Sequence, residues 1–220
     1  MKTPILRKRR CAALMITALL AGLAGCAAAP TRYYTLAETA PIGPGGIVAP
    51  GAAALARAGP IVIELAPIAV PERLARPQLV VREAKGDAGA EISVLEQYRW
   101  TSSFENELRD ALASGIARRL GAVDQTRGTR QSAQPAWRIA VQLRQFDAIE
   151  NRGVEAALSW TARRSDQGST ASCQWSASES ASAGIDALAD AAQRVTARAA
   201  EVMARHIAAL RTDPRAPCPR

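Results

Sequence analysis

The stretch Trp137-Arg138-Ile139-Ala140-Val141-Gln142-Leu143-Arg144 decides the fold class of this chain. Its large apolar residues alternate with polar or small ones, which is the period of a strand with one buried face and one wet face. Turn-forming residues separate it from a second alternating run that begins at Val154, and from a third run in which Cys173 and Trp175 share one side. We therefore expect an antiparallel meander of three strands.

Shorter β-prone segments precede this meander. They cover residues 32–36, 61–65, 78–82 and 91–97, and the last two are expected to form a hairpin with a longer loop. Prolines around residues 68–70 confine that stretch to a sheet edge or a bulge. Together with the meander, these segments predict a sheet of about six antiparallel strands.

Two stretches have helical spacing. In the first, one side is apolar, and its residues are Phe104, Leu108, Leu112, Ile116 and Leu120. Ser102 and Glu105 fit a capping box at its start, and Gly121 fits a C-cap. The second stretch runs from about Ile185 to Leu210 and carries a narrow, alanine-rich apolar stripe. The predicted fold is α+β, an antiparallel sheet of about six strands with two amphipathic helices packed on one face.

The N-terminus has the order of a secretory signal, with a basic leader, an apolar run over residues 12–23 and small residues before a cysteine. The run is shorter than the ~20 residues that a membrane span needs. The stretch Leu23-Ala24-Gly25-Cys26 resembles the lipobox of bacterial lipoproteins. The resemblance implies cleavage between Gly25 and Cys26, a diacylglyceryl group on the Cys26 thiol and an acyl group on its new amino terminus. The alternative is an ordinary signal with an accidental cysteine, which the small residues on both sides of Cys26 disfavour.

The expected organisation follows from this signal. Residues 1–25 are the signal peptide, 26–31 a lipidated tether, 32–211 a single α+β domain and 212–220 a tail rich in proline and arginine. Within the domain, residues 37–60 are rich in proline, glycine and alanine and predict a flexible loop. The tether reaches only ~20 Å when extended, so the domain must lie close to the membrane that holds its acyl chains.

Composition excludes nucleic acid as a partner. The net charge of +8 includes five basic residues of the leader, and the remaining arginines are dispersed among acids. Beyond the leader the chain has three cysteines. If Cys26 is lipidated, Cys173 and Cys218 are left as a possible disulfide in an oxidising compartment. The alternative is that Cys173 is a small buried apolar residue and Cys218 a free thiol in a frayed tail.

Catalytic residues are scarce. His206 is the only histidine, and it lies on or beside the apolar stripe of the last helix, where a packing role is favoured over that of a general base. The sequence has no Gly-x-Ser-x-Gly elbow and no set of ligands spaced for zinc. We therefore expect no enzymatic activity, no metal and no cofactor other than the acyl groups on Cys26.

Three segments carry a family resemblance, and they follow one another after the lipobox. They are Tyr33-Tyr34-Thr35-Leu36, the run from Val70 to Val80 with Arg82 close behind, and Tyr98-Arg99-Trp100 leading into a helix. Together they resemble the ABC-type transport auxiliary lipoprotein family. One departure is Thr101-Ser102-Ser103, where the family often has an acidic residue and a proline after the tryptophan.

The resemblance implies a non-enzymatic outer-membrane lipoprotein that faces the periplasm. Such proteins work with MCE-domain proteins of the inner membrane in intermembrane phospholipid transport. Ala27 agrees with the outer membrane, because an Asp directly after the lipidated cysteine tends to retain enterobacterial lipoproteins in the inner membrane. Two other readings stay open: a regulator of a peptidoglycan synthase or assembly factor of another envelope machine, and a body that itself holds a lipid.

The segment from Pro71 to Pro77 is the predicted partner surface. Its prolines cannot donate to a sheet ladder, and it carries Arg73, Leu74 and Arg76. We expect these three side chains to contact the MCE-domain partner, because arginine is enriched at interfaces and an exposed leucine can fill a pocket. The alternative is an edge strand protected from aggregation by proline and charge.

Overall fold

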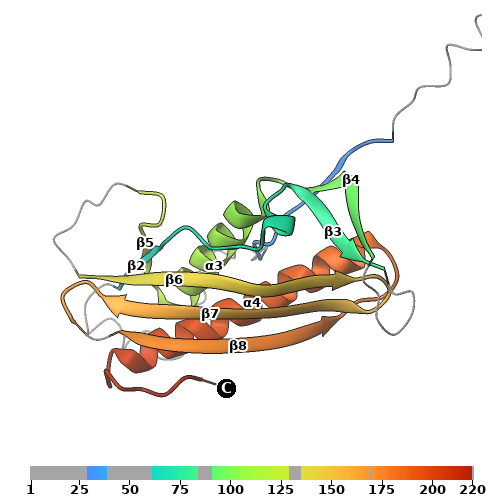
Figure 1. Ribbon diagram of the computed structural model, residues 1–220. Helices are drawn as coiled ribbons and strands as arrows, with labels where there is room; N and C mark the ends of the chain where they lie inside the picture. Colours follow the sequence, from blue (N-terminus) through green and yellow to red (C-terminus); the bar gives the residue numbers. More distant parts are fainter. Residues whose placement is uncertain (1–28, 39–60, 84–90, 129–134, 169, 220) are drawn as a thin grey trace, which may run out of the picture. The chain divides into compact units, whose positions relative to one another are not determined.

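The predicted meander forms one side of the sheet, from β6 in its interior to β8 at its edge. β6 (Ala136–Ile149) pairs antiparallel with β7 (Gly153–Arg164), and β7 pairs antiparallel with β8 (Ala171–Ser180), as Figure 1 shows. The apolar side chains of the alternating run in β6 are buried, which confirms the predicted period. This computed structural model describes residues 29–38, 61–83, 91–128, 135–168 and 170–219.

The other side of β6 is shared between two strands. β2 (Val62–Leu65) pairs with the beginning of β6 and β3 (Gln78–Arg82) with its end, both in parallel. The proline-rich connection between β2 and β3 follows β6, and a single bridge joins Ala69 to Gln142. A two-residue strand, β5 (Val123–Asp124), extends the sheet beyond β2.

The last two strands of the sheet lie beyond β3. β3 forms the predicted antiparallel hairpin with β4 (Ile92–Trp100), with a register shift between Gln78 and Leu79. β1 (Arg32–Tyr34) then pairs in parallel with the end of β4. The sheet therefore has eight strands and is mixed, where about six antiparallel strands were expected. β5 was missed because two residues show no period, and the parallel pairs because pairing partners far apart in sequence leave no local pattern.

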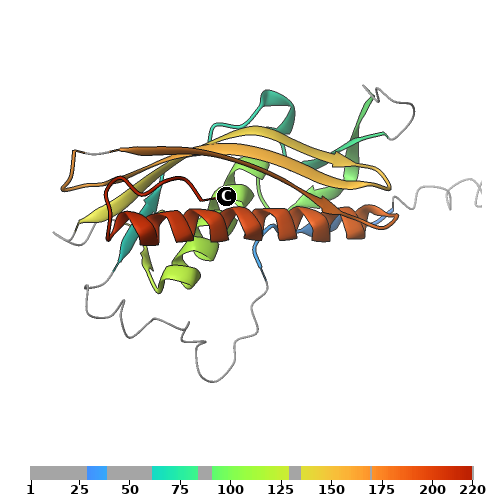
Figure 2. The same cartoon turned by 90° about the horizontal axis from the view of Figure 1, so that it is seen from below.

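Both predicted helices cover one face of this sheet (Figure 2). They are α3 (Phe104–Leu120) and α4 (Ile185–Leu210), and the predicted apolar stripe of each is buried. The helices approach closely where they cross. A Cβ built on Gly115 would lie only 2.8 Å from the Cβ of Ala200. The α+β class and the layer of two helices are confirmed.

The ends of α3 differ in how well they were predicted. Gly121 is the C-cap, with a left-handed φ of 60°, as expected. The capping box of Ser102 and Glu105 is wrong, because the N-cap is Ser103, whose Oγ accepts from the backbone N–H of Asn106 at 3.4 Å. Glu107, not Glu105, receives a weak hydrogen bond of 3.5 Å from the Ser102 hydroxyl.

The predicted flexible loop, residues 37–60, lies outside the described residues except for its first two. Ala37 accepts a hydrogen bond from Gln193, and Glu38 forms ion pairs with Arg118 and Arg119, so these two residues are held against the helices. Among the described residues, no helix combines the length and apolar character needed to cross a bilayer.

Candidate functional site

The predicted lipid attachment and cleavage residues, Cys26 and Gly25, lie outside the described residues. The first strand, β1, begins at Arg32. The functional side chains that the structure does describe come from the segment between Pro71 and Pro77, from two buried carboxylates and from a cluster around Cys173.

The segment between Pro71 and Pro77 is a structural clip. Its centre is a short 3₁₀ turn, η2 (Glu72–Leu74). The guanidinium of Arg73 lies 3.2 Å from a carboxylate oxygen of Asp147, on β6. Asp147 is only 8% exposed, and it also contacts Arg82 at 3.0 Å and the Gln145 amide at 2.8 Å. Removing cations from a buried carboxylate is costly, so Arg73 contributes to stability as well as to the surface.

Leu74 is not the exposed contact residue that the sequence suggested. It is 5% exposed and belongs to the hydrophobic core, so that part of the predicted partner surface is wrong. Leu74 borders an apolar cavity that Trp100, Phe104 and Phe146 also line. The cavity measures about 20 Å³, room for about one water and too small for an acyl chain. The sequence misled because a leucine between two arginines has the local pattern of an exposed turn.

Arg76 is half-buried, and its backbone carbonyl accepts from the N–H of Phe104 at 3.3 Å, which joins the clip to the start of α3. Within the described part of the chain, the buried Nε of Arg76 has no hydrogen-bond partner. The exposed rim of the clip therefore consists of Glu72, Arg73 and Ala75, together with the partly exposed Arg76.

Glu107 joins two of the segments that carried the family resemblance. This carboxylate is 8% exposed and accepts from the Thr35 hydroxyl at 3.0 Å and from the Leu36 N–H at 3.1 Å. It also accepts from the hydroxyl of Thr101, directly after the Tyr98-Arg99-Trp100 stretch. Neither carboxylate was predicted, although Glu107 lies beside Leu108 on the apolar side of its helix, which is a signal for a buried acid.

The aromatic residues of these segments are also structural. Tyr34 on β1 stacks on Tyr98 on β4 with ring centroids 6.4 Å apart. Trp100 packs on Phe104 at 5.8 Å, and Phe104 packs edge-on against Phe146 at 4.9 Å. One aromatic pair thus joins β1 to β4, and a separate series of three rings joins the end of β4 through the start of α3 to the meander.

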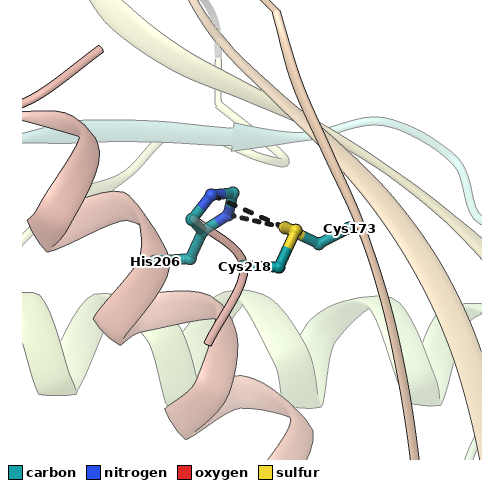
Figure 3. A group of neighbouring side chains, drawn as sticks. All are labelled: Cys173, His206 and Cys218. Atoms are coloured by element: carbon teal, nitrogen blue, oxygen red, sulfur yellow. Dashed lines mark hydrogen bonds between the residues drawn. A yellow bond between two sulfur atoms is a disulfide. The ribbon is translucent and has the colours of Figure 1, made fainter. Parts of the chain in front are cut away.

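A disulfide joins Cys173, on β8, to Cys218, in the tail after α4. Figure 3 shows His206 beside it, with both ring nitrogens 3.6 Å from the Cys173 sulfur. The indole N–H of Trp160 donates to His206 Nδ1 at 3.1 Å, so a neutral ring carries its proton on Nε2. The predicted tail is therefore held against the sheet over a buried histidine.

This cluster is poorly suited to chemistry. His206 is 1% exposed, and burial lowers its pKa, which a hydrogen bond with the Ala216 backbone partly opposes. The donor atoms of Cys173, His206 and Cys218 lie within 4.8 Å of one another, a set of ligand types that suits zinc. A cysteine binds zinc only as a thiolate, however, and both sulfurs are used in the disulfide. The arrangement fits a packing role for His206.

Residues 47–204 match the family described as the ABC-type transport auxiliary lipoprotein component. The chain belongs to this family. The resemblance of the three segments is thereby confirmed, and the chain is an auxiliary lipoprotein component of an ABC-type transport system. Membership also agrees with anchoring to a membrane through lipid.

Two solved structures share the fold of this family member. One is the crystal structure of an uncharacterized protein, with a TM-score of 0.60 and 14% identity, covering 81% of this chain and 99% of the other. The second, from Xanthomonas campestris, has a TM-score of 0.50 and 14% identity, covering 69% of this chain and 85% of the other. At this identity the likeness concerns the fold alone. No curated protein matches the chain.

Proposed function

We propose that this auxiliary lipoprotein lies in the outer membrane, faces the periplasm and serves an MCE-type system for intermembrane phospholipid transport. The observation that carries the proposal is the family match over residues 47–204, downstream of a lipobox that ends at Cys26. Ala27 in place of Asp supports the outer membrane. His206, the only histidine, is buried and makes hydrogen bonds with Trp160 and with the backbone of Ala216, which supports a non-enzymatic role.

The short tether supports a partner that comes to this protein. Five residues lie between Cys26 and Arg32, and the six-residue tether that begins at Cys26 spans at most ~20 Å. A body held so close to one membrane does not carry lipid across the periplasm alone. The partner is therefore an elongated protein anchored in the inner membrane, for which an MCE-domain protein is our candidate.

The proposed contact is the exposed rim of the clip, with Arg73 and Arg76 as its cations. Leu74 supports the rim from beneath rather than filling a pocket of the partner. Because Arg73 balances Asp147, replacing it with glutamate would place two carboxylates together and destabilise the fold. A fair test therefore combines Arg73→Gln, which leaves Arg82 on Asp147, with Arg76→Glu.

The test is cross-linking of the lipidated protein in membranes, followed by affinity purification and mass spectrometry. We expect an MCE-domain protein with the wild-type chain and its loss with Arg73→Gln/Arg76→Glu. Arg163→Glu, which changes an exposed arginine at the far end of β7, is the matched control and should retain the partner. Recovery of a cell-wall synthase instead would favour the regulator, and unchanged recovery with the double variant would leave the clip as a protected edge only.

The anchor is tested separately by intact mass spectrometry of the mature protein. We expect the mature chain to begin at Cys26 and to carry a diacylglyceryl and an N-acyl group. Two or more acyl chains give stable anchoring, so Cys26→Ser should release the protein or leave the uncleaved precursor. A mature, unlipidated chain that begins elsewhere would contradict the anchor.

A further inference from the structure

Exposed apolar side chains gather on β1 and β4. Of the four large apolar residues that are exposed in the described chain, three lie there: Tyr33 at 63%, Ile92 at 43% and Val94 at 37%. The fourth, Val123, is on β5 beyond β2. Scattered single apolar residues need no explanation, but a group on adjacent strands indicates a contact surface. We call Tyr33, Ile92 and Val94 the β1–β4 patch.

The strand register places the three side chains on one face. Val94 lies opposite Val80 on β3, and Ile92 lies opposite Arg82. Beyond the register shift, Arg99 lies opposite Gln78 on β3 and opposite Tyr33 on β1. Cross-strand partners point to the same side of a sheet, and Gln78, Val80 and Arg82 alternate along β3 on one side. The opposite side holds Leu79 and Val81, which are buried in the core.

The patch lies next to the point where the chain enters the folded body. β1 begins at Arg32, which pairs with Tyr98, so Tyr33 is seven residues from Cys26 in the sequence. Seven residues span at most ~25 Å, whatever path they take. Val94 is four residues from Tyr98 along β4, a distance of ~13 Å at most. An anchor at Cys26 thus keeps all three side chains within reach of the bilayer surface.

We propose that the β1–β4 patch inserts into the surface of the membrane that holds the lipid anchor. Tyrosine suits this depth because its ring is apolar and its hydroxyl polar. Arg99 lies on the same face as Tyr33, and its ion-pair partner, Glu96, is 68% exposed. Exposed ion pairs contribute little, so the Arg99 guanidinium exchanges readily to a lipid phosphate. The contact holds the body in one orientation instead of letting it swing about a six-residue tether.

This inference rests on the proposed lipid anchor, which supplies the high local concentration of membrane that a weak patch needs. The test uses the full mature protein, purified with its lipid, in vesicles of phosphatidylethanolamine and phosphatidylglycerol. A trace of phospholipid with a photoactivatable acyl chain is added, and the irradiated protein is digested and analysed by mass spectrometry. We expect lipid adducts on the peptides that contain Tyr33 and residues 92–100.

The double variant Ile92→Ser/Val94→Ser should lower these adducts about tenfold, because two apolar side chains no longer transfer from water to lipid. The matched control is Val123→Ser, an exposed valine on another strand, which should leave the adducts unchanged. Thermal unfolding of each variant separates loss of contact from loss of fold.

The mass of the Cys26 peptide is read in the same digest, so failure of the anchor is seen separately from failure of the patch. Absence of adducts on β1 and β4 overturns the inference whether or not Cys26 is acylated. An oligomer in detergent that the double variant dissociates would assign the patch to a second copy of the chain, which also overturns it.

Discussion

Two halves of the sheet are stabilised in different ways. The meander half, which comprises β6, β7, β8 and α4, has long strands, antiparallel pairing with one register shift between Leu143 and Gln145, and a core of alternating apolar residues. The motif half comprises β1, η2, β3, β4 and the first turn of α3. Its strands are short and its pairing is partly parallel. Its fixed points are two buried carboxylates: its own Glu107, and Asp147 at the end of β6, which holds Arg73 and Arg82 of the motif half.

The meander half depends on generic apolar packing, whereas the motif half depends on specific polar contacts. Apolar burial is non-directional, so the meander half tolerates exchange among apolar side chains of similar size. A buried carboxylate needs particular donors at particular places, and it is costly when they are removed. We therefore expect the meander half to be sensitive to its backbone and covalent link, and the motif half to single polar substitutions.

Gly153→Ala should have the largest effect, because it breaks the turn from which the meander half is built. Gly153 has a φ of +146°, and a Cβ there would lie 2.1 Å from the Glu179 carbonyl oxygen. Strain and overpacking together should cost roughly 3–5 kcal/mol of unfolding free energy in chemical denaturation. Gly168→Ala is the control, since a Cβ there meets nothing within 4 Å. Equal stability of both variants would contradict the register at this turn.

Cys218→Ser tests the covalent link of the same half. The bond between Cys173 and Cys218 closes a loop with a sequence separation of 45, so its loss should cost about 2–4 kcal/mol. The measurement is denaturation with and without reductant, which should destabilise only the wild type. Alkylation of the non-reduced, folded wild type should label neither thiol, and two labelled thiols would exclude the pairing.

Glu107→Ala tests the polar fixed point of the motif half. The substitution leaves Thr35, Leu36 and Thr101 without their acceptor, so unfolding free energy should fall by about 2–3 kcal/mol. Glu105→Ala, in the same helical turn but outside this network, should change it by no more than about 0.5 kcal/mol. If the two variants are equally stable, the motif half is held by apolar packing like its neighbour.

A pH titration of stability should give the smallest effect. The folded pKa of His206 is lowered by burial, so the unfolded chain binds the proton more tightly. The stability that neutral His206 contributes to the fold is therefore fully present above the unfolded pKa of about 6.5, and it is lost as pH falls below that value. Glu38 and Glu179, whose pKa values arginine hydrogen bonds hold low, lose their contribution only below pH about 4.5. His206→Gln should abolish the loss of stability that begins near pH 6.5 and keep the loss below pH about 4.5.

Periodicity explains which parts of the fold were predictable. The alternation from Trp137 to Leu143 and the helical spacing from Phe104 to Leu120 each reflect burial of one face, which a local pattern records directly. Ile185 to Leu210 was predicted to the residue for the same reason. The error at the start of α3 arose because Ser102 and Ser103 are both good caps, and only the geometry selects between them.

The sequence by itself determined the α+β class, the meander, the two helices and the family, because these depend on periodicity and on short motifs. Only the tertiary structure decided that Leu74 is buried, that Arg73 pairs with Asp147, and that Glu107 joins the residues just after β1 to α3. These contacts link residues about 70 positions apart. Whether a charged or apolar side chain is exposed depends on what the distant chain places beside it, and no local pattern carries that information.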